Sequence, residues 1–363
     1  MVPRHLLSRL PLLLPAILCL AIGVLTGLTR AGIDMTELLA TRSAWHSILM
    51  ISGFFGTVIG LERAVASNQR WAFLAPMLSA LGGLLLLSDT TASLSPFFFV
   101  LASAIFCSAS TLLTLKQPAL HAWILLLGAM LWLMGNVAWV VNGSSWISIP
   151  FGLSFLILTI AAERLELTRF LPPRPYAKVL FILIIGVILI GTVCSALSVF
   201  DDNAWLGWGY ALLALWLLNF DVAKRTIRQQ GVTRFLAICL LSGYAWLLVG
   251  GVLLTHLPDL GLFERDAGIH AIALGFIFAM VIGHAPVIFP AVMRIAIPFS
   301  ALFYLPWLLI QIGMSLRFGA ALLSHTVLRE AGALINALAV LSFLLCLVIQ
   351  VIRGFRAQRI PSL

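Results

Sequence analysis

Three histidines fall within long apolar stretches of the sequence, and they are the side chains best suited to chemistry. They are His46, His270 and His284. Ionisable groups inside a membrane are costly, so each is a candidate functional residue. Two neutral imidazoles at matched depth can fill both axial positions of a haem iron in a dry pocket. His46 and His270 each begin an apolar stretch that enters from the same side, so this pair is the expected haem site.

His284 follows His270 by 14 residues along one apolar stretch. An α-helix turns about 100° per residue, so this spacing predicts that the two histidines share a face at opposite depths. His284 is therefore a candidate ligand for a second haem or a copper ion. Met280 is a secondary candidate as a soft ligand, although methionine more often fills space in a core. Because the residue 14 positions after His46 is Gly60, a second pair of facing histidines is not predicted.

The remaining histidines and the cysteines are expected to be structural. His5, His121, His256 and His325 lie at water-accessible ends of the predicted helices. The five cysteines all lie within apolar stretches and form no CxxC pair. Neither a disulfide framework nor a thiolate metal site is therefore predicted.

The elements that must hold the three histidines are membrane-spanning helices. The chain has 363 residues, of which 62% are hydrophobic and 10% charged. This is too little charge for the surface of a soluble enzyme, a disordered chain or a nucleic-acid-binding module. About 20 apolar residues cross a bilayer core. Twelve such stretches predict a single all-α integral membrane domain over residues 1–363, with spans at roughly 10–28, 44–62, 71–88, 97–115, 119–141, 147–163, 177–199, 204–220, 233–254, 267–292, 297–316 and 331–352.

The basic residues predict the orientation of these spans. With the N-terminus in the cytoplasm, all but five of the 22 lysines and arginines fall in inner segments, the exceptions being Arg30, Arg42, Arg265, Arg317 and Arg329. This distribution follows the positive-inside rule and places both termini inside. The net charge of +9 is then a topology signal, and it does not require a nucleic-acid partner. The expected location is a bacterial-type inner membrane, with the lipid bilayer as partner.

The layout and two sequence segments resemble a known group of membrane proteins. The segments are HSILMISGFFGTVIGLERA, which begins at His46, and HAIALGFIFAMVIGHAP, which begins at His270. Histidines on helices 2 and 10 of twelve resemble the haem-copper oxidase subunit I superfamily, which is built from three four-helix arcs with a low-spin haem between those helices. The smaller NnrS-type proteins, haem- and copper-containing and linked to denitrification and nitric-oxide stress, are more similar still.

This resemblance implies a b-type haem, with or without copper, held by His46 and His270 and more weakly by His284. It also implies a role in electron transfer or nitric-oxide handling, with an electron donor as partner. The residues leave open whether the chain catalyses a reaction; an enzyme of this kind would be an oxidoreductase. The predicted helices 147–163 and 177–199 contain no histidine, so the binuclear centre of a proton-pumping oxygen reductase is not expected.

Two further segments carry paired charges at predicted inner helix ends. They are Glu62-Arg63 and Glu163-Arg164, four predicted helices apart. The similarity hints at repeated four-helix arcs. Glu62 and Arg63 are secondary site candidates, which could carry protons or partner a haem propionate. The alternative is a pair of helix-end ion pairs at the lipid headgroups.

Two other function classes stay open. Twelve spans and a basic inner face also suit a secondary transporter of a small solute without a haem, and Pro286, Pro290, Pro298 and Pro306 could break its helices at the midplane. No charged residue at the predicted midplane would couple an ion to such transport. A membrane scaffold or assembly factor is the third class, for which the sequence offers no positive feature.

Overall fold

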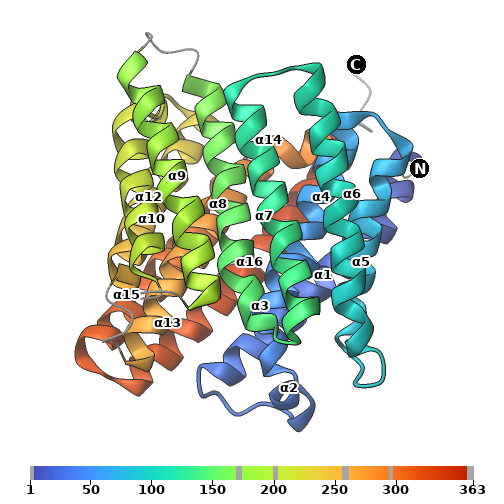
Figure 1. Ribbon diagram of the computed structural model, residues 1–363. Coiled ribbons are helices and arrows are strands. Elements are labelled where there is room, and N and C mark those ends of the chain that lie inside the picture. Colours follow the sequence, from blue (N-terminus) through green and yellow to red (C-terminus); the bar gives the residue numbers. More distant parts are fainter. Residues whose placement is uncertain (1–3, 169–173, 199–202, 256–260, 294–296, 358–363) are drawn as a thin grey trace. The chain divides into compact units, whose positions relative to one another are not determined.

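The structure is a computed structural model that describes residues 4–168, 174–198, 203–255, 261–293 and 297–357 (Figure 1). All regular elements within these ranges are helices, as the sequence predicts. Inside hydrocarbon a helix satisfies its backbone hydrogen bonds within its own segment, which favours this outcome. The chain separates into two compact units. Unit 1 comprises Met1–Glu166 and Thr192–Asp202, and unit 2 comprises Leu167–Gly191 and Asn203–Leu363.

Ten helices in the described ranges are long and apolar enough to cross a membrane. Two shorter apolar helices, Arg70–Leu85 and Ala204–Phe220, coincide with the two remaining predicted spans. Several bounds agree closely with the sequence; for example, the stretch expected at 119–141 forms the helix Leu120–Asn142. The chain is therefore a multi-pass helical membrane protein.

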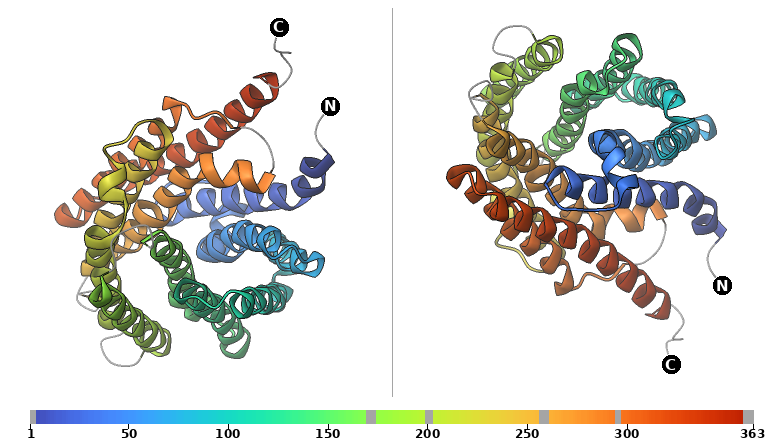
Figure 2. Two further views of the ribbon diagram at one scale, coloured as in Figure 1. Left: turned by 90° about the horizontal axis from the view of Figure 1, so that it is seen from above. Right: turned by 90° about the horizontal axis from the view of Figure 1, so that it is seen from below.

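Unit 1 carries His46 on its second membrane-crossing segment. Its elements are α1 (Arg4–Arg30), α2 (Glu37–Thr41), η1 (Ser43–Trp45), α3 (His46–Ile48), η2 (Leu49–Gly56), α4 (Thr57–Ser67), η3 (Arg70–Phe73), α5 (Leu74–Leu85), η4 (Ala92–Leu94), α6 (Ser95–Lys116), α7 (Leu120–Asn142), η5 (Ser145–Ile147) and α8 (Ser148–Leu167). Helix α1 packs on η2, α5 on α6, and α6 on α7. Seen end-on, the helices from α4 to α8 follow one another in chain order around an arc (Figure 2).

Unit 2 carries His270 and His284. Its elements are most of α9 (Pro175–Leu197), then α10 (Ala204–Phe220), α11 (Ala223–Thr226), α12 (Gly231–Thr255), α13 (Leu262–His270), η8 (Ala271–Phe278), α14 (Ala279–Met293), η9 (Ala301–Phe303), α15 (Tyr304–Leu323) and α16 (Thr326–Ala357). Helix α12 packs on α10, η8 and α14, while α15 packs on α13 and α16. The long pair α15 and α16 lies side by side in both views of Figure 2.

Two of the crossing segments change from α-helix to π-helix next to a candidate histidine. The π-helix η2 begins three residues after His46, and η8 begins directly after His270. A π-helix bonds each N–H to the carbonyl five residues back, and it is rare outside short insertions at functional sites. Hydropathy does not distinguish it from an α-helix, so the sequence did not predict it.

The contact between α9 and α10 supplies a stability prediction. A Cβ atom on Gly191 would lie 2.6 Å from the Cα of Leu206 and 2.7 Å from the carbonyl carbon of Trp205, which are backbone atoms that cannot move aside. Gly191→Ala should therefore destabilise the protein by about 1–3 kcal/mol through overpacking. The measurement is thermal unfolding in detergent.

A glycine on the same helix is the matched control. A Cβ atom on Gly186 would meet nothing within 4 Å. Gly186→Ala should leave the unfolding temperature unchanged or raise it, since alanine is favoured over glycine in a helix by up to about 1 kcal/mol. Equal effects of the two substitutions would contradict the close packing at Gly191.

Candidate functional site

His46 lies at the first turn of α3, and its ring is oriented by helix α1. The Nδ1 atom of His46 lies 2.6 Å from the carbonyl oxygen of Gly23. A carbonyl only accepts, so Nδ1 carries the hydrogen and donates it. The neutral ring then has its lone pair on Nε2, which is the protonation state that a metal ligand needs.

Two glycines of α1 make room for the side chains of α3 and η2. A Cβ atom on Gly27 would lie 2.7 Å from Cε1 of His46, and one on Gly23 would lie 2.8 Å from Sδ of Met50. The glycines are four residues apart and so share one face of α1. They allow the imidazole and the thioether to lie directly against the helix backbone.

The π-helix η2 is held by side chains from two neighbouring helices. Ser79 of α5 donates to the carbonyl of Ser52 at 2.6 Å, and Trp132 of α7 donates from Nε1 to the Ser52 hydroxyl at 3.1 Å. Gly56 lets the Trp132 ring approach, because a Cβ there would lie 2.6 Å from it. Irregular backbone at membrane depth needs such partners, and these two helices provide them.

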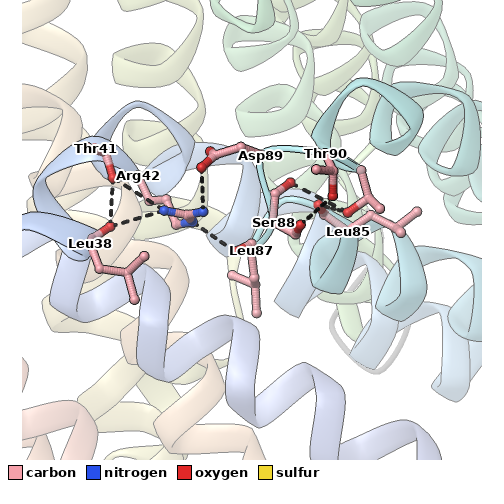
Figure 3. Close-up of polar contacts among 9 residues, drawn as sticks. Leu38, Thr41, Arg42, Leu85, Leu87, Ser88, Asp89 and Thr90 are labelled. Atoms are coloured by element: carbon pink, nitrogen blue, oxygen red, sulfur yellow. Dashed lines mark hydrogen bonds and ion pairs between the residues drawn. The ribbon is translucent and has the colours of Figure 1, made fainter.

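Arg42 fixes the segment that leads into His46. Its Nε donates to the carbonyl of Leu87 at 2.9 Å, and its guanidinium pairs with the Asp89 carboxylate at 3.2 Å (Figure 3). The sequence places Arg42 in an outer segment, yet the residue is only 7% exposed. This arginine therefore ties the start of the His46 helix to the loop after α5.

His270 ends α13, and an acidic residue one turn earlier orients its ring. Its Nδ1 lies 2.8 Å from the backbone carbonyl of Asp266 and 3.3 Å from the carboxylate of the same residue. Both groups accept from Nδ1–H, so the lone pair is on Nε2, as it is in His46. The Asp266 carboxylate also forms an ion pair with Arg317 of α15, whose side chain is 5% exposed.

The sequence did not predict Asp266 and Arg317 as site residues, because both residues lie beyond the ends of the predicted spans. The expected spans were 267–292 and 297–316, whereas α13 begins at Leu262 and α15 continues to Leu323. Charged residues lower the hydropathy of the first turns of α13 and the last turns of α15. These turns are nevertheless helical, and Asp266 and Arg317 pair with each other there. The spacing of four residues between Asp266 and His270 was the available signal.

His284 also donates from Nδ1, here to the carbonyl of Met280 at 2.8 Å. Its lone pair is again on Nε2. The thioether of Met280 packs towards α12, since a Cβ on Gly243 would press on its terminal methyl carbon. Met280 is 3% exposed and fits the role of a core-filling residue.

The prediction that His270 and His284 share one face depends on the helical period between them. It assumed a regular α-helix, but η8 lies between the two residues. Three glycines of this segment face α12, where Gly268 packs on Leu253, Gly275 on Trp246 and Gly283 on Cys239. The whole segment from α13 to α14 therefore packs on α12.

The segments that follow His46 and His270 also share short sequence motifs. Each reads His-x-Ile at its start and Val-Ile-Gly further along, at residues 58–60 and 281–283. In each segment the histidine precedes a π-helix, and its Nδ1 donates to a backbone carbonyl, which lies on α1 for His46 and on the same helix for His270.

The paired charges towards the C-terminal ends of α4 and α8 come together within unit 1. The side chain of Glu163 interacts electrostatically with those of Glu62 and Arg63. On the same helix, Glu166 lies 3.9 Å from Nε2 of His121. The secondary candidates Glu62 and Arg63 thus belong to a mixed cluster of acidic and basic groups, separate from the His46 contacts described above.

The histidines could each supply one nitrogen ligand to a haem iron. Within the described ranges no group of three or more His, Cys, Asp or Glu side chains could hold a metal ion. A haem iron needs only one imidazole on each side, and His46 and His270 have the required tautomer. Of the other histidines, His325 is exposed and His256 lies outside the described residues. All five cysteines are free.

A comparison with known proteins identifies one family. The model described as a domain of unknown function (DUF8744) matches residues 9–352. No curated protein and no solved structure matches the chain.

Proposed function

The chain belongs to the DUF8744 family, and we propose that it is a membrane haem protein in which His46 and His270 supply the two axial ligands of a b-type haem. The main support is the matched environment of the two histidines. In both, Nδ1 donates to a backbone carbonyl at 2.6 or 2.8 Å, and both stand beside a π-helix. A haem iron needs one such nitrogen ligand on each side.

When bound, the haem would supply one-electron chemistry at its iron. The residues of the chain would hold it from both sides, so electron transfer is favoured over activation of a small ligand at an open iron position. His284 is the candidate for an additional copper or haem. Nitric oxide and denitrification enter the proposal only through the resemblance to NnrS-type proteins, as does the unidentified electron donor.

The proposed topology has twelve spans with both termini in the cytoplasm of a bacterial-type cell. It counts the short helices Arg70–Leu85 and Ala204–Phe220 as spans, together with the ten longer ones. The distribution of lysine and arginine supports this orientation. Under it, His46 and His270 both lie towards the outer side of the inner membrane.

The first test is a visible absorption spectrum of the detergent-purified protein, oxidised and dithionite-reduced, with iron and copper analysis of the same sample. Sharp low-spin bands on reduction, with one iron per chain, are expected. A colourless and metal-free protein from haem-replete cells would overturn the proposal. It would favour the alternative of a solute carrier, to be followed by transport assays.

A further inference from the structure

The carboxylate of Asp266 links His270 to a buried arginine on another helix. Asp266 presents a carboxylate oxygen to Nδ1 of His270 at 3.3 Å, and its other oxygen accepts from Arg317. Helix α13 carries the first two residues and α15 carries the third. Nδ1 of His46 and Nδ1 of His270 each donate to a backbone carbonyl, that of Gly23 and that of Asp266. At His270 the Asp266 carboxylate adds a negative charge beside the same Nδ1 atom.

Arg317 is held in a position that is costly for the fold. Its Nε is buried and has no hydrogen-bond partner among the described residues. A Cβ on Gly332 of α16 would lie 2.9 Å from its Cγ, so the side chain is packed tightly on that side. A buried ion pair with an unsatisfied donor is weak evidence for a role in stability. Asp266, the acidic member of this pair, contacts the candidate ligand His270, which points instead to a role at the site.

We propose that the Asp266–Arg317 pair sets the electron-donating strength of His270, and with it the reduction potential of the haem. This inference rests on the proposed function. A carboxylate that accepts from Nδ1–H makes Nε2 a more basic ligand. A more basic ligand stabilises ferric over ferrous iron and lowers the potential. Arg317 draws charge away from Asp266 and therefore opposes this effect.

The two charges should act in opposite directions on the midpoint potential, measured by redox titration of the purified full-length protein. Asp266→Asn should favour the ferrous form about tenfold, a rise of about 59 mV for a one-electron couple. Arg317→Gln should lower the potential, because it leaves the carboxylate without its cation. Arg317→Lys should stay near the wild-type value.

The controls separate this tuning from damage to the fold. Asp221→Asn changes another buried aspartate, which caps the turn at Ala223 from the end of α10, and it should leave the potential unchanged. The double variant Asp266→Asn/Arg317→Met removes both charges and should titrate above the wild type. If Asp266→Asn yields no folded protein, Arg317→Gln tests the inference alone. The inference predicts a lower midpoint potential for this variant, whereas a substitution that merely weakened the His270 ligand would raise it.

Each outcome supports or overturns a specific statement. Opposite shifts in Asp266→Asn and Arg317→Gln, with the low-spin spectrum retained, support the inference. Haem that is retained with an unchanged potential in both variants overturns the inference and leaves the proposed function standing. Wild-type protein without haem overturns both.

Discussion

His46→Ala and His270→Ala should each abolish the low-spin haem spectrum of the purified protein. Each substitution removes one axial nitrogen, and an iron with a single imidazole cannot remain low-spin with two nitrogen ligands. The loss should be complete in both variants, since the two ligands act on one iron. The measurement is the reduced-minus-oxidised spectrum with the haem content per chain.

His325→Ala is the matched control for this pair. His325 is exposed at the start of the last helix and is not a proposed ligand, so its variant should keep the full spectrum. Protein recovery and gel-filtration profile should be the same in all three variants. An unchanged spectrum in both His46→Ala and His270→Ala would exclude these residues as ligands.

Gly27→Ala should lower the haem content without removing either histidine. The added methyl group would lie 2.7 Å from the His46 ring, and a side chain, unlike a backbone, can turn away. The imidazole would then leave its hydrogen bond to Gly23. Loss of such an orienting contact typically weakens metal binding about 10–100-fold. The haem-to-protein ratio after gel filtration in detergent measures the effect.

The control for Gly27 is again Gly186→Ala, whose methyl group meets nothing within 4 Å. It should purify with the wild-type haem content. Full haem content in Gly27→Ala would show that haem binding does not depend on the position of the His46 ring against α1.

The helices were predictable because a bilayer imposes a length on apolar segments, and the errors have a local cause. The stretch expected at 177–199 forms α9 over Pro175–Leu197. In contrast, Glu264 and Arg265 interrupt the apolar pattern before His270, so the expected span begins five residues after α13 does. Hydropathy does not record that charges can be paired inside the protein.

The site was predictable only as a set of residues, without the contacts that orient them. His46 and His270 were identified by their type and depth. Their partners come from other parts of the fold or from local geometry, such as the Gly23 carbonyl on α1 and Arg317 on α15. No residue pattern of period 3.6 indicates where a helix widens, so the π-helices required the structure.

The π-helices also have a consequence for insertions and deletions among relatives. From His46 to Val58 there are 12 positions, but from His270 to Val281 there are 11. Because η2 and η8 are each eight residues long, the difference falls in the α-helical turns on either side of them. A residue gained or lost in these α-helical turns rotates the histidine by about 100° about the helix axis relative to the π-helix. Single-residue gaps between each histidine and its π-helix should therefore be rare in the family, because they would re-aim the imidazole.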